Sequence, residues 1–344
     1  KDKVSLSSVQ TDTDIKLSGL IHNFLFSRLP YNIERFWCEK FNNELISILN
    51  KNHFDMVLLE GLPLALYIET IRQYFTGKLV MRAHNVEHKI WEGLAKNTSN
   101  PVKRYYYSLL ASRIKEFESS NLLKYDALIP ITEADSNWFK KLGYKGPLFT
   151  FPFALDPKEY LPETNPGKIA NILFLGALDW SPNIHGLKWF VRKVWPELRN
   201  SFPELRLHIA GRNPSRQVQK ILSAPGVHFH GEVEDSREYL RLGQIMIVPL
   251  FSGSGMRVKI LEGMAAGKVI LSTSFAVSGI PAENKKHIFV EDTAPCFIHQ
   301  IGTLINKPHL TEATIINARS FIRENYDIFV LSKKLSHFLN SLNS

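Results

Sequence analysis

Cysteines and long apolar runs are both scarce in this sequence. Its 344 residues include only Cys38 and Cys296, too few and too far apart for a disulfide scaffold, which indicates a reducing compartment. No apolar stretch reaches the length of a membrane span. The opening residues KDKVSLSSV lack the apolar region of a signal peptide. With 44% hydrophobic and 22% charged residues, the chain is expected to be a cytoplasmic globular protein.

Runs of basic residues are also missing, although the formal net charge is +9. Residues 1–167 carry 21 Lys and Arg against 19 Asp and Glu, whereas residues 168–344 carry 21 against 14. The basic side chains are scattered, without the aromatic interleaving of a nucleic-acid site, so no nucleic-acid partner is expected. The excess in the second half suits an anionic small ligand, or peripheral contact with an anionic membrane at the inner face.

The length of the sequence and its alternating strand and helix patterns predict two α/β domains. A single core usually stops growing below this size. Alternating strand and helix patterns occur on both sides of the proline-rich stretch Phe149 to Gly167, which is typical of a linker. We therefore expect two Rossmann-like domains facing a cleft, at residues 1–160 and 161–320. An amphipathic tail, residues 321–344 within a helical stretch from Thr311 to Leu342, is expected to cross back to the first domain.

In the first half, short apolar runs and amphipathic stretches predict the elements. Strands are expected at Lys3–Ser8, Phe54–Leu59, Lys78–Arg82 and Ala127–Ile131, and helices at Ile33–Leu49, Leu64–Phe75 and Pro101–Leu123.

Three polar side chains follow these predicted strands. His84 and Glu87 come after Lys78–Arg82, where ligands bind in open α/β sheets. A histidine packed under the loop is the alternative. Thr132 follows the next strand and suits an N-cap better than a catalytic role. The triplet Asp12-Thr13-Asp14 could hold a divalent metal, but a solvated turn is favoured.

In the second half, the same patterns predict a second sheet. Strands are expected at Asn171–Leu175, Leu205–Ala210, Val227–His230, Ile245–Val248 and Val269–Leu271, and helices at Ile184–Leu198, Ser236–Leu242 and from Met256 to Gly267.

The stretch from Pro249 to Thr273 predicts an anion site. A glycine loop joins a buried strand to a helix, so free N–H groups and the helix dipole face one point. Arg257 and Lys259 suit a diphosphate, and Glu262 suits the hydroxyls of a ribose. The alternative is an ordinary βαβ unit whose glycines only permit close packing.

Several motifs together resemble family-4 (group 1) glycosyltransferases of the GT-B fold. The signature G-x-G-x-R-x-K-x-x-E occurs at residues 253–262, as GSGMRVKILE. FLGALDWSPN, IAGRNP and HGEV precede it in the same order, and RAHNVE and ITEAD match in the first half. The combination covers most of the chain.

The resemblance implies transfer of a sugar from a nucleotide-diphosphate sugar to a saccharide or lipid-linked acceptor in surface polysaccharide assembly. It implies retention of anomeric configuration, no cofactor and no obligatory metal. Lys259 and Arg257 would stabilise the departing diphosphate and His84 would reach the transferred sugar. The implied donor-binding residues are Gly253, Ser254, Gly255, Glu262, Gly176, Arg212, His230, Gly231 and Val233, and the acceptor-side residues are Glu87 and Thr132.

The chain departs from the family pattern in three places. Ser254 stands where many relatives have the first glutamate of a Glu-x7-Glu pair. The loop after Asn171–Leu175 has Asp179 and no basic residue. The N-terminal domain is expected to lack its first strand and helix.

These departures leave two alternatives open: a sugar-nucleotide epimerase of GT-B type, and a non-catalytic nucleotide-sugar-binding protein. A dehydrogenase is disfavoured because the glycine motif lacks a third glycine.

Overall fold

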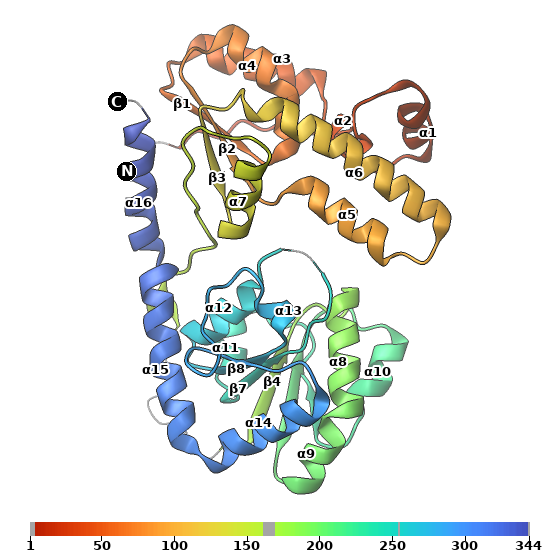
Figure 1. The fold of residues 1–344 in the computed structure, drawn as a ribbon, viewed down its shortest axis with the longest axis vertical. Helices are drawn as coiled ribbons and strands as arrows, with labels where there is room; N and C mark the ends of the chain where they lie inside the picture. The colour runs from red at the N-terminus through yellow and green to blue at the C-terminus, as the bar shows by residue number, and fades with distance from the viewer. Residues whose placement is uncertain (1–3, 161–168, 254, 343–344) are drawn as a thin grey trace. The chain divides into compact units, whose positions relative to one another are not determined.

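The chain folds into two compact units, each described here by itself (Figure 1). The computed structural model describes residues 4–160, 169–253 and 255–342. Unit 1 comprises Lys1–Pro152 and Leu335–Ser344, and unit 2 comprises Phe153–Lys334. Helix α16 (Ile328–Ser341) therefore begins in unit 2 and ends in unit 1. Within the described ranges, no helix is both long and apolar enough to cross a membrane.

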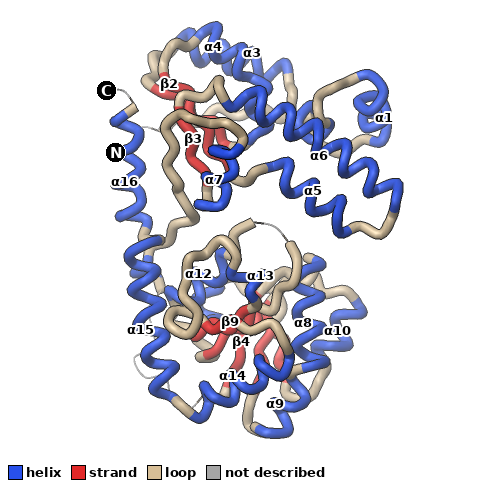
Figure 2. Tube along the Cα trace, in the orientation of Figure 1, coloured by secondary structure: helices blue, strands red, loops and turns tan. Residues whose placement is uncertain are grey.

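Unit 1 contains a three-stranded parallel sheet in the order β1-β2-β3. In the central strand, Leu79 and Val80 are fully enclosed. Helices pack around the sheet (Figure 2). The strands are β1 (Met56–Glu60), β2 (Lys78–Ala83) and β3 (Ala127–Pro130). The helices are α1 (Leu17–Phe26), α2 (Tyr31–Glu34), α3 (Glu39–Lys51), the 3-10 helix η1 (Leu62–Tyr67), α4 (Ile68–Tyr74), α5 (Glu87–Asn97), α6 (Pro101–Leu122) and α7 (Glu133–Lys141).

Two predicted elements of unit 1 are wrong. The described residues 4–8 form no strand, because Val4 and Leu6 are exposed and nothing pairs with them. The first long helix begins at Glu39 rather than Ile33. The Tyr67 hydroxyl bonds both Phe36 O and Cys38 N at 2.8 Å, which holds the preceding turn outside the helix.

The predicted linker starts too early. Its first residues run along β3, where Phe149 N donates to Leu128 O and Phe151 N donates to Pro130 O. They therefore belong to the edge of the sheet in unit 1. The remainder from residue 161 to Gly167 lies outside the described residues.

Unit 2 contains a six-stranded parallel sheet in the order β6-β5-β4-β7-β8-β9. The strands are β4 (Asn171–Leu175), β5 (Arg206–Ala210), β6 (Val227–Phe229), β7 (Ile245–Val248), β8 (Val269–Ser272) and β9 (Phe289–Val290). The helices are the 3-10 helix η2 (Pro157–Glu159), α8 (Ser181–Lys193), α9 (Trp195–Ser201), α10 (Arg216–Leu222), α11 (Ser236–Leu240), α12 (Val258–Ala265), α13 (Ser274–Val277), α14 (Ala294–Asn306) and α15 (Pro308–Asn325).

Helices cover both faces of this sheet. Side chains of a strand alternate between the two faces, and here both faces carry apolar side chains that pack against helices. Ile172 and Phe174 of β4 pack with α8, α9, α10 and α14. Leu173, between them, packs on the opposite face with α11, α12 and α15. The result is a three-layer α/β/α unit, and the predicted α/β fold with parallel sheets is confirmed.

Two predicted helices of the second half are each split. The helix expected over Ile184–Leu198 ends at Lys193, and α9 starts at Trp195 with Pro196 in its first turn, where a missing N–H costs nothing. The helical tail breaks between α15 and α16, where Leu155 N donates to Tyr326 O and Ile328 N donates to Leu155 O.

Candidate functional site

The candidate site of unit 2 lies where the strand order reverses. From β4 the chain proceeds to β5 and β6 on one side and then returns to β7 on the other side of β4. In doubly wound sheets, ligands bind beyond the carboxyl ends of the strands at such a reversal. The segments that follow β4 and β7, including helix α12, supply most of the residues predicted for the donor.

The loop after β7 requires glycine at two places. Gly253 has φ +116° and Gly255 has φ +81°, values that side chains rarely adopt. A Cβ at Gly253 would also lie 2.8 Å from the Trp180 ring. The loop leads into the eight-residue helix α12, whose first N–H groups have no partner within the helix. Ser254 lies outside the described residues.

Lys259 joins the two central strands. Its Nζ donates to the main-chain oxygen of Leu175 at 2.8 Å and to Oδ1 of Asn183 at 2.9 Å. Leu175 ends β4, Asn183 lies in the first turn of α8, and Lys259 comes from α12 after β7. Burial and the nearby charge of Arg257 lower the pKa of Lys259 to about 7. Its charge at neutral pH therefore depends on what lies beside it.

Gly176 makes room for this lysine. A Cβ at Gly176 would lie 2.7 Å from both Lys259 Nζ and Asn183 Nδ2. A Cβ at Gly211 would lie 2.0 Å from the oxygen of Gly176, and Gly211 N donates to Gly231 O at 2.8 Å. The backbones after β4, β5 and β6 are thus in direct contact.

Arg257 precedes α12 and turns back toward the loop. Its side chain is buried, its Nη1 donates to the oxygen of Gly255, and its guanidinium lies 5.5 Å from the Phe275 ring centre. Burial lowers the pKa of Arg257, but arginine keeps its charge in proteins. It is therefore a fixed cation beside the glycine loop.

Glu262 faces Tyr160 rather than the two cations. The Tyr160 hydroxyl donates to Glu262 Oε1 at 3.2 Å, and Tyr160 is only 8% exposed. Burial and the adjacent carboxylate raise the pKa of Tyr160, so the phenol stays a proton donor. This bond fixes the direction of the glutamate and leaves its second oxygen for another partner.

The other predicted donor residues lie on the loops after β5 and β6. Arg212 Nε is 3.5 Å from Asp179 Oδ2, which also accepts from Asn213 at 3.1 Å. His230 Nε2 lies 2.8 Å from His208 Nδ1. Val233 is half-buried against the core that contains α12.

His208 stacks between His228 and His230. Its ring centre lies 5.2 Å from that of His228 and 5.1 Å from that of His230. Burial, together with these imidazoles, lowers the pKa of His208 to about 4 and lowers that of His230. Among the described residues, no three His, Cys, Asp or Glu side chains are arranged to hold a metal ion. Asp12 pairs instead with Lys16 at 2.6 Å.

In unit 1, His84 pairs with Glu60. Its Nε2 lies 2.9 Å from Glu60 Oε2, and Arg82 Nη1 lies 3.4 Å from the other carboxylate oxygen. Glu60 ends β1 and His84 follows β2, so neighbouring parallel strands bring the two side chains together. Both side chains are nearly half exposed, at 47% and 45%. His84 is therefore not packed under its loop.

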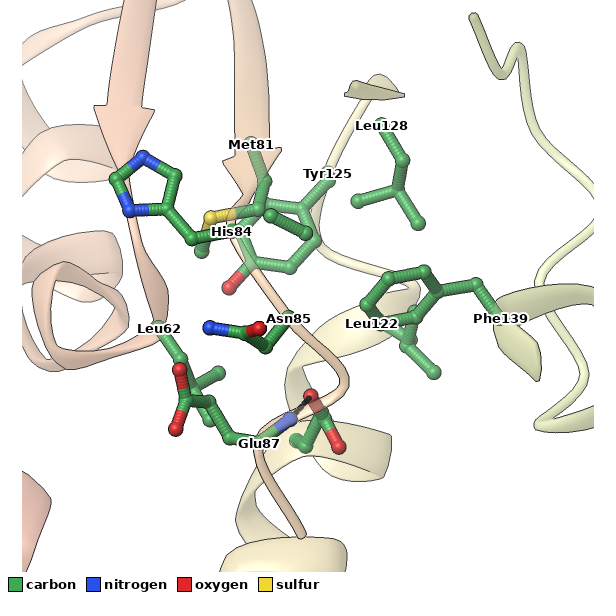
Figure 3. Close-up of a pocket in the computed structure, with 11 residues that line it drawn as sticks. Leu62, Met81, His84, Asn85, Glu87, Leu122, Tyr125, Leu128 and Phe139 are labelled. Carbon is green, nitrogen blue, oxygen red and sulfur yellow. Dashed lines mark hydrogen bonds between the residues drawn. The ribbon is translucent and has the colours of Figure 1, made fainter. Parts of the chain in front are cut away.

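Glu87 and its neighbours border a small pocket (Figure 3). Burial and the nearby Glu118 raise the pKa of Glu87. Glu118 is buried, accepts from Glu87 N at 3.1 Å and pairs with His88 Nδ1 at 2.5 Å. Leu62, Met81 and Tyr125 line the same pocket. The side chain of Glu87 is thus held in a poorly solvated place near His84.

Thr132 acts as an N-cap. Its Oγ1 accepts from Asp135 N at 3.0 Å at the start of α7, so the expected capping role is confirmed.

Asn183, Tyr160 and Glu60 were not predicted as site residues. The sequence places Glu60 at a strand end, which is a usable signal. Asn183 and Tyr160 are identified only by contacts with residues 76 and 102 positions away.

Part of unit 2 matches a known protein family. Residues 170–307 match the family model described as Glycosyl transferases group 1. A Klebsiella pneumoniae protein, described as an uncharacterized 44.6 kDa protein in the cps region, is 25% identical over 298 residues, covering 81% of this chain and 72% of that protein.

Two solved structures are similar over most of the chain. Sucrose-phosphate synthase from Thermosynechococcus elongatus gives a TM-score of 0.68 at 14% identity, covering 90% of this chain and 78% of that one. Anabaena Alr3699/HepE in complex with UDP gives 0.67 at 11% identity, covering 88% and 82%. Residues 170–307 therefore match the group 1 glycosyltransferases, and the parallel α/β fold of the chain is that of the structurally similar GT-B glycosyltransferases.

Proposed function

We propose that this protein is a retaining glycosyltransferase of the hexosyltransferase type. It moves a sugar from a nucleotide-diphosphate sugar to a saccharide or lipid-linked acceptor in surface polysaccharide assembly. The observation that carries the proposal is the place of Lys259, at the strand reversal between two glycine-dependent loops. The group 1 family match, the UDP complex of the Anabaena protein and the cps-region description of the Klebsiella relative support it.

The diphosphate of the donor would occupy the start of α12. Free N–H groups and the helix dipole favour an anion there, and Arg257 supplies a fixed cation. Lys259 would take up a proton and donate the additional N–H to a phosphate oxygen. The departing diphosphate gains charge in the transition state, so these groups stabilise it more than the bound donor.

The remaining donor contacts follow from the strand ends. Glu262, oriented by Tyr160, would bind the ribose through its second oxygen. Arg212 and the stretch from His230 to Val233 would border the nucleoside. In unit 1, His84 would contact the transferred sugar, and Glu87 would lie toward the acceptor.

A transfer assay with a panel of UDP-, GDP- and other nucleotide-sugars tests the proposal directly. Release of the nucleoside diphosphate together with a glycosylated product is expected, and NMR of the product should show an unchanged anomeric configuration. Donor consumed without an acceptor, with an isomer appearing, would show an epimerase instead. Saturable donor binding with no turnover on any acceptor would contradict a catalytic role.

Glu262→Ala provides a sharper test of the site. Loss of a charge-assisted hydrogen bond should weaken nucleotide binding by about 1–3 kcal/mol, measured by calorimetry. Glu312→Ala removes an exposed carboxylate from α15 of the same unit and should leave binding unchanged. Equal affinities for the two variants would argue against Glu262 as a donor contact.

We also propose that transfer requires no divalent metal and takes place at the cytoplasmic face of the membrane. Turnover that persists in excess EDTA would agree with the first point, and loss of turnover restored by magnesium or manganese would contradict it. Membrane-associated protein in fractionated cells, released by high salt, would agree with the second.

A further inference from the structure

Helix α1 exposes an apolar stripe. Leu17, Leu20, Ile21, Phe24 and Leu25 recur at three- and four-residue spacing, which places them on one side of the helix. Leu17 is 73% exposed, Ile21 55%, Phe24 43% and Leu25 63%. In an ordinary surface helix of a water-soluble domain, such a stripe would face the protein core. An exposed stripe of this kind marks an interaction surface.

Polar contacts attach the other side of α1 to unit 1. Asn23 is the buried residue of the helix, and it bonds Leu29 O and accepts from Arg113 Nη1 of α6 at 3.3 Å. Gly19 approaches Tyr31 so closely that a Cβ would lie 2.8 Å from its hydroxyl. The helix is therefore fixed with its polar side inward and its apolar side outward.

An apolar groove lies beside this stripe. Four of the stripe residues line it together with Tyr106 of α6: Leu20, Ile21, Phe24 and Leu25. Helix α6, which supplies Tyr106, lies side by side with α5 (Figure 1). Val102 and Tyr105, near the start of α6, are 76% and 67% exposed. The exposed apolar surface thus extends from α1 onto the start of α6.

The surroundings of this surface are basic. Residues 93–115, which include the turn between α5 and α6, contain five Lys or Arg and no Asp or Glu. Four of them are exposed: Lys96, Lys103, Arg104 and Lys115. Within the described part of the chain, these four form no ion pair. Arg28 is exposed after α1, whereas Lys16 pairs with Asp12 at 2.6 Å.

We propose that α1 and the α5–α6 turn form a docking surface for an anionic lipid bilayer. Apolar side chains of α1 enter the headgroup and acyl boundary, while the surrounding cations attract anionic lipids. Exposed tyrosines suit the same interface. A bilayer is preferred over a protein partner because it accepts scattered cations without requiring matched carboxylates. This surface lies wholly in unit 1, and the inference rests on the proposed location at the membrane and names the surface that would bind there.

Vesicle co-sedimentation of the whole chain tests the inference. Binding is expected to vesicles of phosphatidylglycerol mixed with phosphatidylcholine, and little binding to phosphatidylcholine alone. Binding should fall as salt rises, because the attraction is partly electrostatic. Ile21→Glu with Leu25→Glu should reduce it by at least about tenfold, since two large side chains no longer enter the apolar layer.

Matched controls separate this surface from general effects. Ile316→Glu changes a side chain that is 68% exposed on α15 of unit 2 and should leave vesicle binding unchanged. Lys103→Gln with Arg104→Gln should weaken binding by about thirtyfold, because two charges at about 1 kcal/mol each correspond to about 2 kcal/mol. Lys193→Gln with Lys220→Gln removes the same charge from exposed positions of unit 2 and should have little effect.

A second measurement does not depend on losing binding. Leu25→Trp should show fluorescence quenched by brominated phosphatidylglycerol vesicles, beyond the quenching of the parent protein, and Ile316→Trp should not. Equal binding to neutral vesicles, unchanged binding of the Ile21 and Leu25 variant, or no quenching at position 25 would overturn the proposal. So would self-association through α1 without vesicle binding. Nucleotide binding measured on the same samples tests the transfer proposal separately.

Discussion

Lys259 Nζ lies 2.9 Å from Oδ1 of Asn183, a residue 76 positions earlier in the chain. This bond joins the helix after β7 to the helix after β4, across the point where the strand order reverses. It holds a lysine whose pKa is lowered to about 7 by burial and by the nearby Arg257. The predictions for unit 2 below depend on this contact.

Lys259 should take up a proton when a nucleoside diphosphate binds. At pH 8 the amine is mostly neutral, because its pKa of about 7 lies below the pH. A nearby phosphate favours the charged form and raises the pKa. Calorimetry of UDP binding in buffers of different ionisation enthalpy should show uptake of up to about one proton, with affinity falling as the pH rises above 7. Lys259→Met should abolish the uptake, and an unchanged uptake in this variant would exclude Lys259 as its source.

Gly176→Ala should weaken UDP binding without unfolding unit 2. The new Cβ would lie 2.7 Å from Lys259 Nζ, and the flexible end of the lysine can move away. We expect a loss of affinity of about tenfold, equivalent to about 1.4 kcal/mol, with a thermal midpoint close to that of the parent. Gly302→Ala, whose Cβ would only touch Phe202 at 3.6 Å, serves as the control. Parent-like UDP affinity in Gly176→Ala would show that the lysine position does not matter for binding.

Glu60 should act on the transfer reaction through His84. Glu60→Gln retains the shape of the side chain but removes the charge beside the imidazole, so we expect kcat to fall by about tenfold, with the KM for the donor little changed. Glu69→Gln, in the exposed pair with Lys124, is the control. If Glu60→Gln changes only the thermal midpoint, the contact is structural.

Glu87→Gln should stabilise unit 1 near neutral pH. Burial, and then Glu118, raise the pKa of Glu87 above the ordinary 4.5. The folded protein thus binds this proton more tightly than the unfolded chain does, and stability is lost as the pH rises above 4.5 through the raised pKa. Urea unfolding should show a higher free energy of unfolding for Glu87→Gln at pH 7 and a smaller difference at pH 4.

Glu116→Gln, at an exposed position of α6, should show no such pH dependence. A variant of Glu87 that is less stable than the parent at pH 7 would mean that the carboxylate makes a favourable interaction in the folded state.

Strands β7 and β8 could be predicted because they are buried at every position. A strand that is buried on both faces gives a short run of apolar or small residues, which is not typical of a surface element. The glycine loop and α12 follow from the same local pattern. The helix was predicted to start at Met256, whereas α12 starts at Val258, because Arg257 precedes the helix and bonds back to Gly255.

Contacts between distant segments could not be predicted in this way. No local signal indicates that Tyr160 would bond Glu262, or that Tyr67 would hold the turn before α3. The edge pairing of Phe149 and Phe151 with β3 was hidden by nearby prolines, which are typical of linkers. In each case a side chain or a strand edge far along the chain decides the local structure.

Lys259 already has two oxygen acceptors in this structure, Leu175 O and Asn183 Oδ1. A protonated lysine has three N–H donors, so these two bonds leave one donor for an incoming anion. In the proposed donor site, a single phosphate would gain that one donor from Lys259. A diphosphate that also reached the N–H groups of α12 and Arg257 would gain several contacts at once. The proposed site would therefore favour a nucleoside diphosphate over inorganic phosphate, which is abundant in any cell.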